Sequence, residues 1–145
     1  MVARVYLWNP AHVKSHMQES DLEMLHNLMT YHGDKVKYFD FIQHTLSFTE
    51  TTDIVDGNEI FNTELSGVIP KIRKEAIKSL IELKRTRVIS QAKDRNDLSR
   101  IIGRLDSPAV LLWKASTKPE FEGLNAIELT IKVTYSKPAA FANTI

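Results

Sequence analysis

The chain has 145 residues, no cysteine, a hydrophobic fraction of 43% and 19 basic against 18 acidic residues, so its formal net charge is +1. This size and composition are typical of one globular domain and argue against a disordered chain. The lack of cysteine excludes a disulfide framework and thiolate chemistry. The first residues lack the pattern of a signal peptide, and no apolar run approaches about 18 residues. We therefore expect a cytoplasmic protein without a membrane partner.

The first part of the chain predicts a strand followed by a helix. Residues 2–8 carry apolar side chains on both faces, which is typical of a central strand covered on both sides. Ser20 and Glu23 have the spacing of a capping box, in which each side chain bonds the other's backbone N–H. A helix is therefore expected to begin at Ser20, and Gly33 supplies its C-terminal stop.

Four further segments have the composition of strands. Residues 35–49 form one predicted strand, and the slip in their alternation near 39–41 indicates a bulge. Asp56-Gly57 between two short apolar pieces predicts a hairpin. Residues 109–113 form a short apolar run, and residues 127–135 alternate between apolar and polar side chains in the clearest strand pattern of the chain.

Charge is distributed unevenly along the chain. Residues 68–105 contain eleven basic and four acidic residues, a balance of +7, while the rest of the chain has a balance of −6. Such a separation of charge suggests that partners are selected by a local patch rather than by total charge.

The basic segment predicts one helix followed by an interruption. Apolar residues recur at three- and four-residue steps over 70–83, and Pro70 suits a first helical turn. The pattern then slips, so we expect a kink, a break or a short strand over 84–90. A second helical piece over 98–105 is expected after an N-cap at Asn96 or Asp97, although one bent helix is an alternative.

These elements together predict an α+β fold with the order β-α-β-β-α-(α)-β-β. Two or three helices would cover a largely antiparallel sheet, in a ferredoxin-like arrangement with one extra strand. Residues 1–136 would form one domain, and residues 137–145 a C-terminal interaction tail. The expected core residues are those at the apolar positions of the most periodic elements: Leu25, Leu28, Ile72, Leu80, Leu129 and Ile131.

The leading hypothesis for function is a non-enzymatic assembly protein that binds its own copies or another protein. The strand 127–135 would pair at a sheet edge, and the apolar end of the tail would contact a neighbour. The interface candidates are Lys132, Tyr135, Phe141 and Ile145. A component of a bacteriophage or other viral assembly fits the size and the lack of cysteine, with the host cytoplasm or the virion as its location.

Nucleic-acid binding is the first alternative. Basic residues on one face of a helical segment over 71–104 can follow a phosphate backbone. The candidate residues are Lys71, Lys74, Lys78 and Arg85. No aromatic residue for base stacking occurs in 68–105, and a solvated helix face also carries such charges.

A metal- or His-dependent hydrolase is the third hypothesis. His12 and His16 are four residues apart, which places two imidazoles on one helix face for a metal, and His44 could act as a general base. No general-base motif, nucleophile spacing or phosphate-binding glycine loop accompanies them. We therefore expect no cofactor and do not favour an enzyme.

Overall fold

The computed structural model describes residues 2–10, 23–24, 36–70, 72–93, 99–104, 107–116, 126–136 and 138–142. This part of the chain is mostly β, with one α-helix, α2 (Lys74–Thr86), and the 3-10 turn η3 (Gln43–Thr45). The strands are β1 (Val2–Trp8), β2 (Glu23–Met24), β3 (Lys37–Ile42), β4 (Ser47–Val55), β5 (Asn58–Pro70), β6 (Ile89–Lys93), β7 (Ser99–Ile102), β8 (Val110–Ser116), β9 (Ala126–Tyr135) and β10 (Ala140–Ala142).

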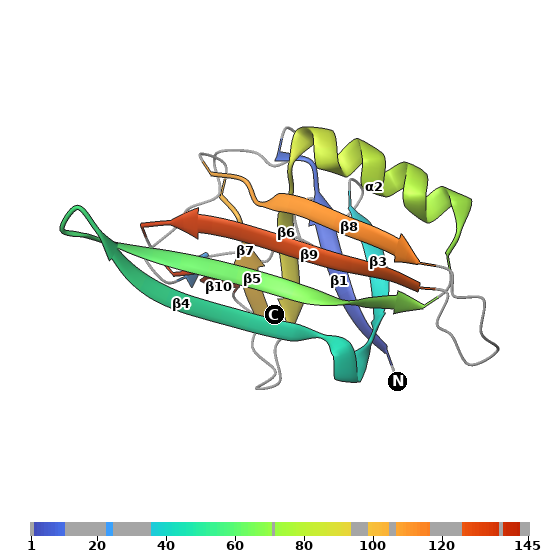
Figure 1. Ribbon diagram of the computed structural model, residues 1–145, viewed down its shortest axis with the longest axis horizontal. Coiled ribbons are helices and arrows are strands. Elements are labelled where there is room, and N and C mark those ends of the chain that lie inside the picture. The colour runs from blue at the N-terminus through green and yellow to red at the C-terminus, as the bar shows by residue number, and fades with distance from the viewer. Residues whose placement is uncertain are drawn as a thin grey trace.

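The strands form two sheets. Sheet A has the order β2-β10-β7-β6-β1-β3, and sheet B has the order β4-β5-β9-β8. Neighbouring strands are antiparallel except for the short pair β10 and β2. Figure 1 shows the long strands of sheet B in front of sheet A, whose strands run across them, with α2 beside β8 at one edge of sheet B.

The predicted α+β fold with two or three helices over one sheet is wrong. Residues 99–102, which were expected in a second helix, form β7 between β6 and β10, and Glu23–Met24 are a strand where a helix was expected. The apolar spacing around Ile101 and Ile102 fits a helix as well as a strand. Pairing on both sides, with Ile101 and Ile102 both buried, overrides this weak local preference.

The single predicted strand over 35–49 is also wrong, because two strands of different sheets occupy it. β3 belongs to sheet A and β4 to sheet B, and η3 turns the chain between them. Thr45 fixes this turn: its hydroxyl donates to the Ile42 carbonyl at 2.6 Å and accepts from the Val68 N–H at 3.0 Å. The bulge expected near 39–41 is absent, because residues 37–42 pair with β1 in an uninterrupted register; the chain changes sheet after them, at η3.

Other local predictions are confirmed. β1 lies inside sheet A between β3 and β6, and β4 and β5 form a hairpin at Asp56 and Gly57, whose φ values are 51° and 80°. Two consecutive positive φ values are typical of the tight turn that suits the twist of a hairpin. The interruption after the basic helix also exists, since α2 ends at Thr86 and β6 begins at Ile89.

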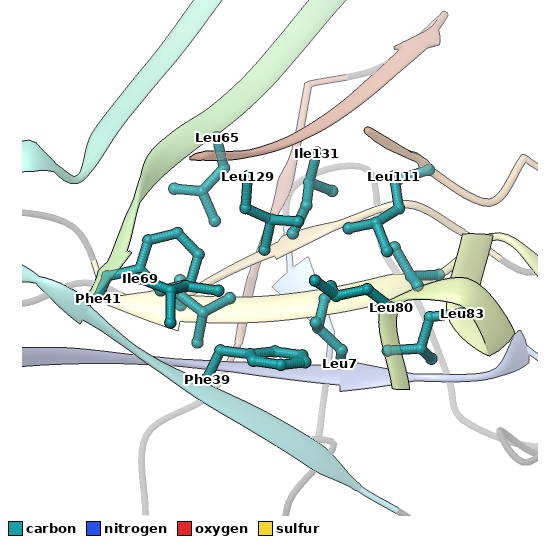
Figure 2. Packing of buried hydrophobic residues seen from close by; sticks show 14 of the residues in the cluster. Leu7, Phe39, Phe41, Leu65, Ile69, Leu80, Leu83, Leu111, Leu129 and Ile131 are labelled. Atoms are coloured by element: carbon teal, nitrogen blue, oxygen red, sulfur yellow. The ribbon is translucent and has the colours of Figure 1, made fainter. Parts of the chain in front are cut away.

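The hydrophobic core lies between the two sheets and is closed on one side by α2 (Figure 2). Of the residues expected there, Leu80, Leu129 and Ile131 are buried, Ile72 is only partly buried, and Leu25 and Leu28 lie outside the described residues. β5 passes so close to β3 that a Cβ on Gly67 would lie 2.3 Å from the Phe41 ring. Only glycine permits this approach without displacing the ring.

Candidate interaction surfaces

The β4–β5 hairpin extends beyond the rest of sheet B. β9 ends at Tyr135, which lies opposite Phe61, so residues 53–60 pair only with each other and form a two-stranded arm. Figure 1 shows this arm projecting from the body of the protein. Three aliphatic side chains lie on it, and Ile54, with 73% of its surface exposed, is the most exposed large hydrophobic residue of the described chain.

The arm is also acidic. It carries Asp53, Asp56 and Glu59 and has no basic residue. Ile54 lies directly opposite Glu59 in the register of the hairpin, so an apolar and an anionic side chain share one face. The arm therefore combines exposed apolar surface with a charge of −3, a combination that suits a basic partner with apolar surface of its own.

The outer edge of β4 is the long free edge of sheet B on this side. Within the described ranges its nine residues pair only with β5, and most of them are exposed. By contrast β9, which was expected at a sheet edge, lies between β5 and β8 and has both edges paired. The prediction that β9 pairs with another chain at a sheet edge is therefore wrong. Such pairing requires a strand with unpaired backbone N–H and C=O groups.

α2 carries an exposed basic stripe. Lys74, Lys78 and Arg85 occur at steps of four and seven residues and, at about 100° per residue, fall on one side of the helix. Ile81, 44% exposed, lies among them, whereas Leu80 and Leu83 face the core from the opposite side. We call Lys74, Lys78, Ile81 and Arg85 the basic stripe. Lys71, the fourth candidate for this surface, lies outside the described residues.

The rest of the predicted basic face from 71 to 104 does not continue this surface. Arg100 and Arg104 lie at β7 in sheet A, where their guanidinium groups hold the returning end of the chain. Arg104 Nη2 donates to the Pro138 carbonyl at 3.0 Å, and its guanidinium carbon lies 4.9 Å from the centre of the Tyr135 ring. The positive charge of the segment is thus divided between an exposed helix and an internal contact.

Glu50 completes this internal contact. Its carboxylate accepts hydrogen bonds from Arg100 Nη2 and from the Ala139 N–H, each at 2.8 Å, and Arg100 Nη2 also donates to the Ala139 carbonyl at 3.1 Å. The Arg100 and Glu50 side chains are only 11% and 21% exposed. Residues 138–142 therefore lie on their own domain, and β10 pairs with β7 and β2 inside sheet A.

The four predicted interface residues fall in different places. Lys132 is exposed on β9, in register with Glu64 of β5, whereas Tyr135 is half-buried against Arg104. Phe141 lies in β10, paired with Arg100, and Ile145 lies outside the described residues. Lys132 and Tyr135, three residues apart on β9, therefore point to opposite faces of sheet B.

An open hollow of about 640 Å³ lies over the middle of sheet B. Thr49, Glu64, Lys132 and Val110 form one row across its four strands, and Arg87 reaches it from the end of α2. Its lining contains no histidine among the described residues. The described lining of the hollow thus presents hydroxyls and dispersed charges.

The described residues give no structural support for the hypothesis of a histidine-dependent site. His12 and His16 lie outside the described residues, and His44 is exposed in η3. Within the ranges that the structure describes, no group of three or more histidine, aspartate or glutamate residues converges as metal ligands.

Two ion pairs connect β3 to its neighbours, one to β1 and the other to α2. Arg4 donates two hydrogen bonds to Asp40 across the β1–β3 pair, at 2.8 and 3.1 Å, and these bonds hold the pKa of the Asp40 carboxyl below its ordinary value. Lys37 donates to Glu82 at 2.8 Å, which lowers the pKa of that carboxyl and ties α2 to β3. Glu82 also interacts electrostatically with Lys78 and Arg85 of the basic stripe, but its hydrogen-bonded partner is Lys37.

Sequence reasoning found the basic stripe but missed the arm. The hairpin was predicted from Asp56-Gly57, and the adjacent Ile54 and Val55 were a signal for an exposed apolar tip. Within the described part of the chain, no helix is long and apolar enough to span a membrane. No protein-family model, no curated protein and no solved structure matches this chain.

Proposed function

We propose that this protein is a non-enzymatic assembly subunit, a small component of a homo- or hetero-oligomer, and that the arm is its main binding element. The observation that carries the proposal is the 73% exposure of Ile54 on an arm that no third strand of the described chain covers. A two-stranded hairpin is only marginally stable by itself, so one that projects with apolar side chains gains stability when a partner covers it.

The charges of the arm support a specific contact rather than aggregation. Three acidic residues surround the exposed aliphatic side chains, so two arms repel each other. Burying Ile54 and Val55 would contribute about 25 cal/mol for each Å² of apolar surface, before the cost of association. A complex with a partner that has positive charge and apolar surface would be stabilised both by charge pairing and by burial of apolar surface.

Sedimentation velocity across a wide range of protein concentration tests this function. We expect the wild-type protein to associate and the Ile54→Thr/Val55→Thr variant, which keeps β propensity but loses apolar surface, to stay monomeric. Leu112→Thr is the matched control, because Leu112 is an exposed leucine of another strand, outside the arm. Association that survives in the arm variant would show that the arm is not the binding element.

Nucleic-acid binding remains the second candidate, and the basic stripe supports it. Lys74, Lys78 and Arg85 span about 16 Å of the helix axis with their side chains exposed. The test is binding of a labelled oligonucleotide: affinity should fall steeply with salt and be lost in Lys74→Glu/Lys78→Glu. Lys114→Glu, on β8, is the matched control. Binding that this pair of changes leaves intact would exclude the stripe as the phosphate-binding surface.

A further inference from the structure

We propose that the arm binds the basic stripe of a second copy of this chain, so that copies join head to tail. This inference rests on the proposed assembly function and names its partner. The arm consists of residues 53–60, and the basic stripe consists of Lys74, Lys78, Ile81 and Arg85 of α2.

The charges of the two surfaces are complementary. The arm has three acidic residues and no basic one, while residues 73–87 have six basic and two acidic residues, a balance of +4. One of those two acids, Glu82, is already bound to Lys37. Opposite charges on two exposed surfaces steer association and set the orientation of the complex.

The apolar residues are complementary as well. Ile54 is 73% exposed on the arm and Ile81 is 44% exposed within the basic stripe, and each has charged residues beside it. Contact between the two isoleucines would remove both from water while the charges around them pair. The stripe extends about 16 Å along α2, and each strand of the arm about 7 Å from Asp53 to Val55, so the stripe is long enough to cover the arm.

The positions of the two surfaces exclude this contact within one chain. Figure 1 shows the arm at one end of the molecule and α2 along the opposite part of it. Each copy would therefore use its arm on one neighbour and its stripe on another. Such a heterologous contact forms a ring if the rotation closes and a filament if it does not.

Symmetric contacts between like surfaces are disfavoured by the same charges. Two arms would bring together Asp53, Asp56 and Glu59 of each copy, and two stripes would bring together lysines and arginines. Like charges placed opposite each other suppress a contact. In the head-to-tail arrangement, by contrast, the arm and the basic stripe of every copy are each bound to a surface of opposite charge.

Two charge-reversal variants test the arrangement. The arm variant is Asp53→Lys/Glu59→Lys, and the stripe variant is Lys74→Glu/Lys78→Glu; circular dichroism first confirms that both are folded. Asp56 is left unchanged because its φ of 51° suits few side chains. Each variant keeps one intact surface, so each should be monomeric alone. An equimolar mixture should then give a dimer and no larger species. The intact arm of the stripe variant can bind the intact stripe of the arm variant, and no second intact pair is left.

A protein with both reversals should not recover the wild-type series, because the changed arm has a balance of +1 and the changed residues 73–87 a balance of 0. Raising NaCl from about 0.05 M to about 0.5 M should weaken wild-type association about tenfold or more. A mixture of the two variants that stays monomeric overturns the inference, as does a wild-type protein that never associates. If Ile54→Thr/Val55→Thr abolishes assembly while the stripe variant assembles normally, the inference fails and the proposed function stands. If neither change has an effect, both fail.

Discussion

Glu50 Oε2 and Arg100 Nη2 lie 2.8 Å apart, and this salt bridge joins β4 of sheet B to β7 of sheet A where residues 138–142 return to the domain. Because both side chains are largely buried, removal of one partner leaves the other charged group without its counter-ion. We expect Glu50→Ala to lower the free energy of unfolding by about 3 kcal/mol, and Glu50→Gln, which keeps an acceptor for the Ala139 N–H, to lower it by less. Urea unfolding measures both, and equal losses in the two variants would contradict the role of the charge.

Truncation before Pro138 should destabilise the domain. β10 pairs inside sheet A, and three hydrogen bonds hold Pro138 and Ala139. At about 1 kcal/mol for each bond, we expect a loss of about 3 kcal/mol or more. Thermal unfolding of a chain that ends at residue 137 measures this loss. An unchanged Tm would show that residues 138–142 contribute nothing to the domain.

Gly67→Ala should be destabilising although alanine is compatible with a strand. Its Cβ would lie 2.3 Å from the Phe41 ring, so the ring or β5 must move, at a cost of about 1–3 kcal/mol. A second substitution, Phe41→Leu, makes room and should make Gly67→Ala nearly neutral in that background. A double-mutant cycle measured by urea unfolding checks this coupling. Additive losses would mean that the two residues do not collide.

Leu129→Ala and Leu112→Ala form a matched pair on the adjacent strands β9 and β8. Leu129 is 1% exposed in the core between the sheets, whereas Leu112 is 38% exposed. We expect a loss of about 2–5 kcal/mol for Leu129→Ala and a much smaller one for Leu112→Ala. Similar losses would contradict the assignment of the buried face of sheet B.

The Arg4–Asp40 pair predicts a small, pH-dependent contribution. The hydrogen bonds from Arg4 lower the pKa of Asp40 in the folded protein below 3.8, so its stabilisation is present above about pH 4 and disappears as the pH falls through the folded pKa. Because both side chains are about one-third exposed or more, Asp40→Asn should cost only about 0.5 kcal/mol near neutral pH. The difference from wild type in urea unfolding should shrink as the pH falls through the folded pKa of Asp40, and a difference that grows there would reverse the sign of the argument.

The elements that the sequence predicted correctly are those with a signal within a few residues. Alternation located β9, the Asp56-Gly57 pair located the hairpin, and the slip after Leu83 located the end of α2. The failures are elements that depend on distant partners. Residues 99–102 become a strand because β6 and β10 pair with them, and the turn at Thr45 depends on a bond to Val68.

For the candidate surfaces too, local sequence patterns predict one and miss the other, which depends on distant pairing. The basic stripe could be predicted, because helical periodicity alone places Lys74, Lys78 and Arg85 on one side of α2. The arm could not, because its exposure depends on β9 ending opposite Phe61, and no local pattern contains that register. The edge expected for β9 was wrong for the same reason, since β5 and β8 pair with both of its sides.

The order of the strands also determines when this protein can fold during its synthesis. β9, which lies between β5 and β8, and β10, which lies between β7 and β2, are both within the last twenty residues. Neither sheet can therefore be completed until the ribosome has made residues 126–142. Until then the exposed edges of β5, β7 and β8 are open to mispairing, which favours aggregation of incomplete chains. Synthesis of β9 and β10 is thus the event that allows both sheets to close, and a chain truncated before them would be a substrate for chaperones rather than a shorter version of the protein.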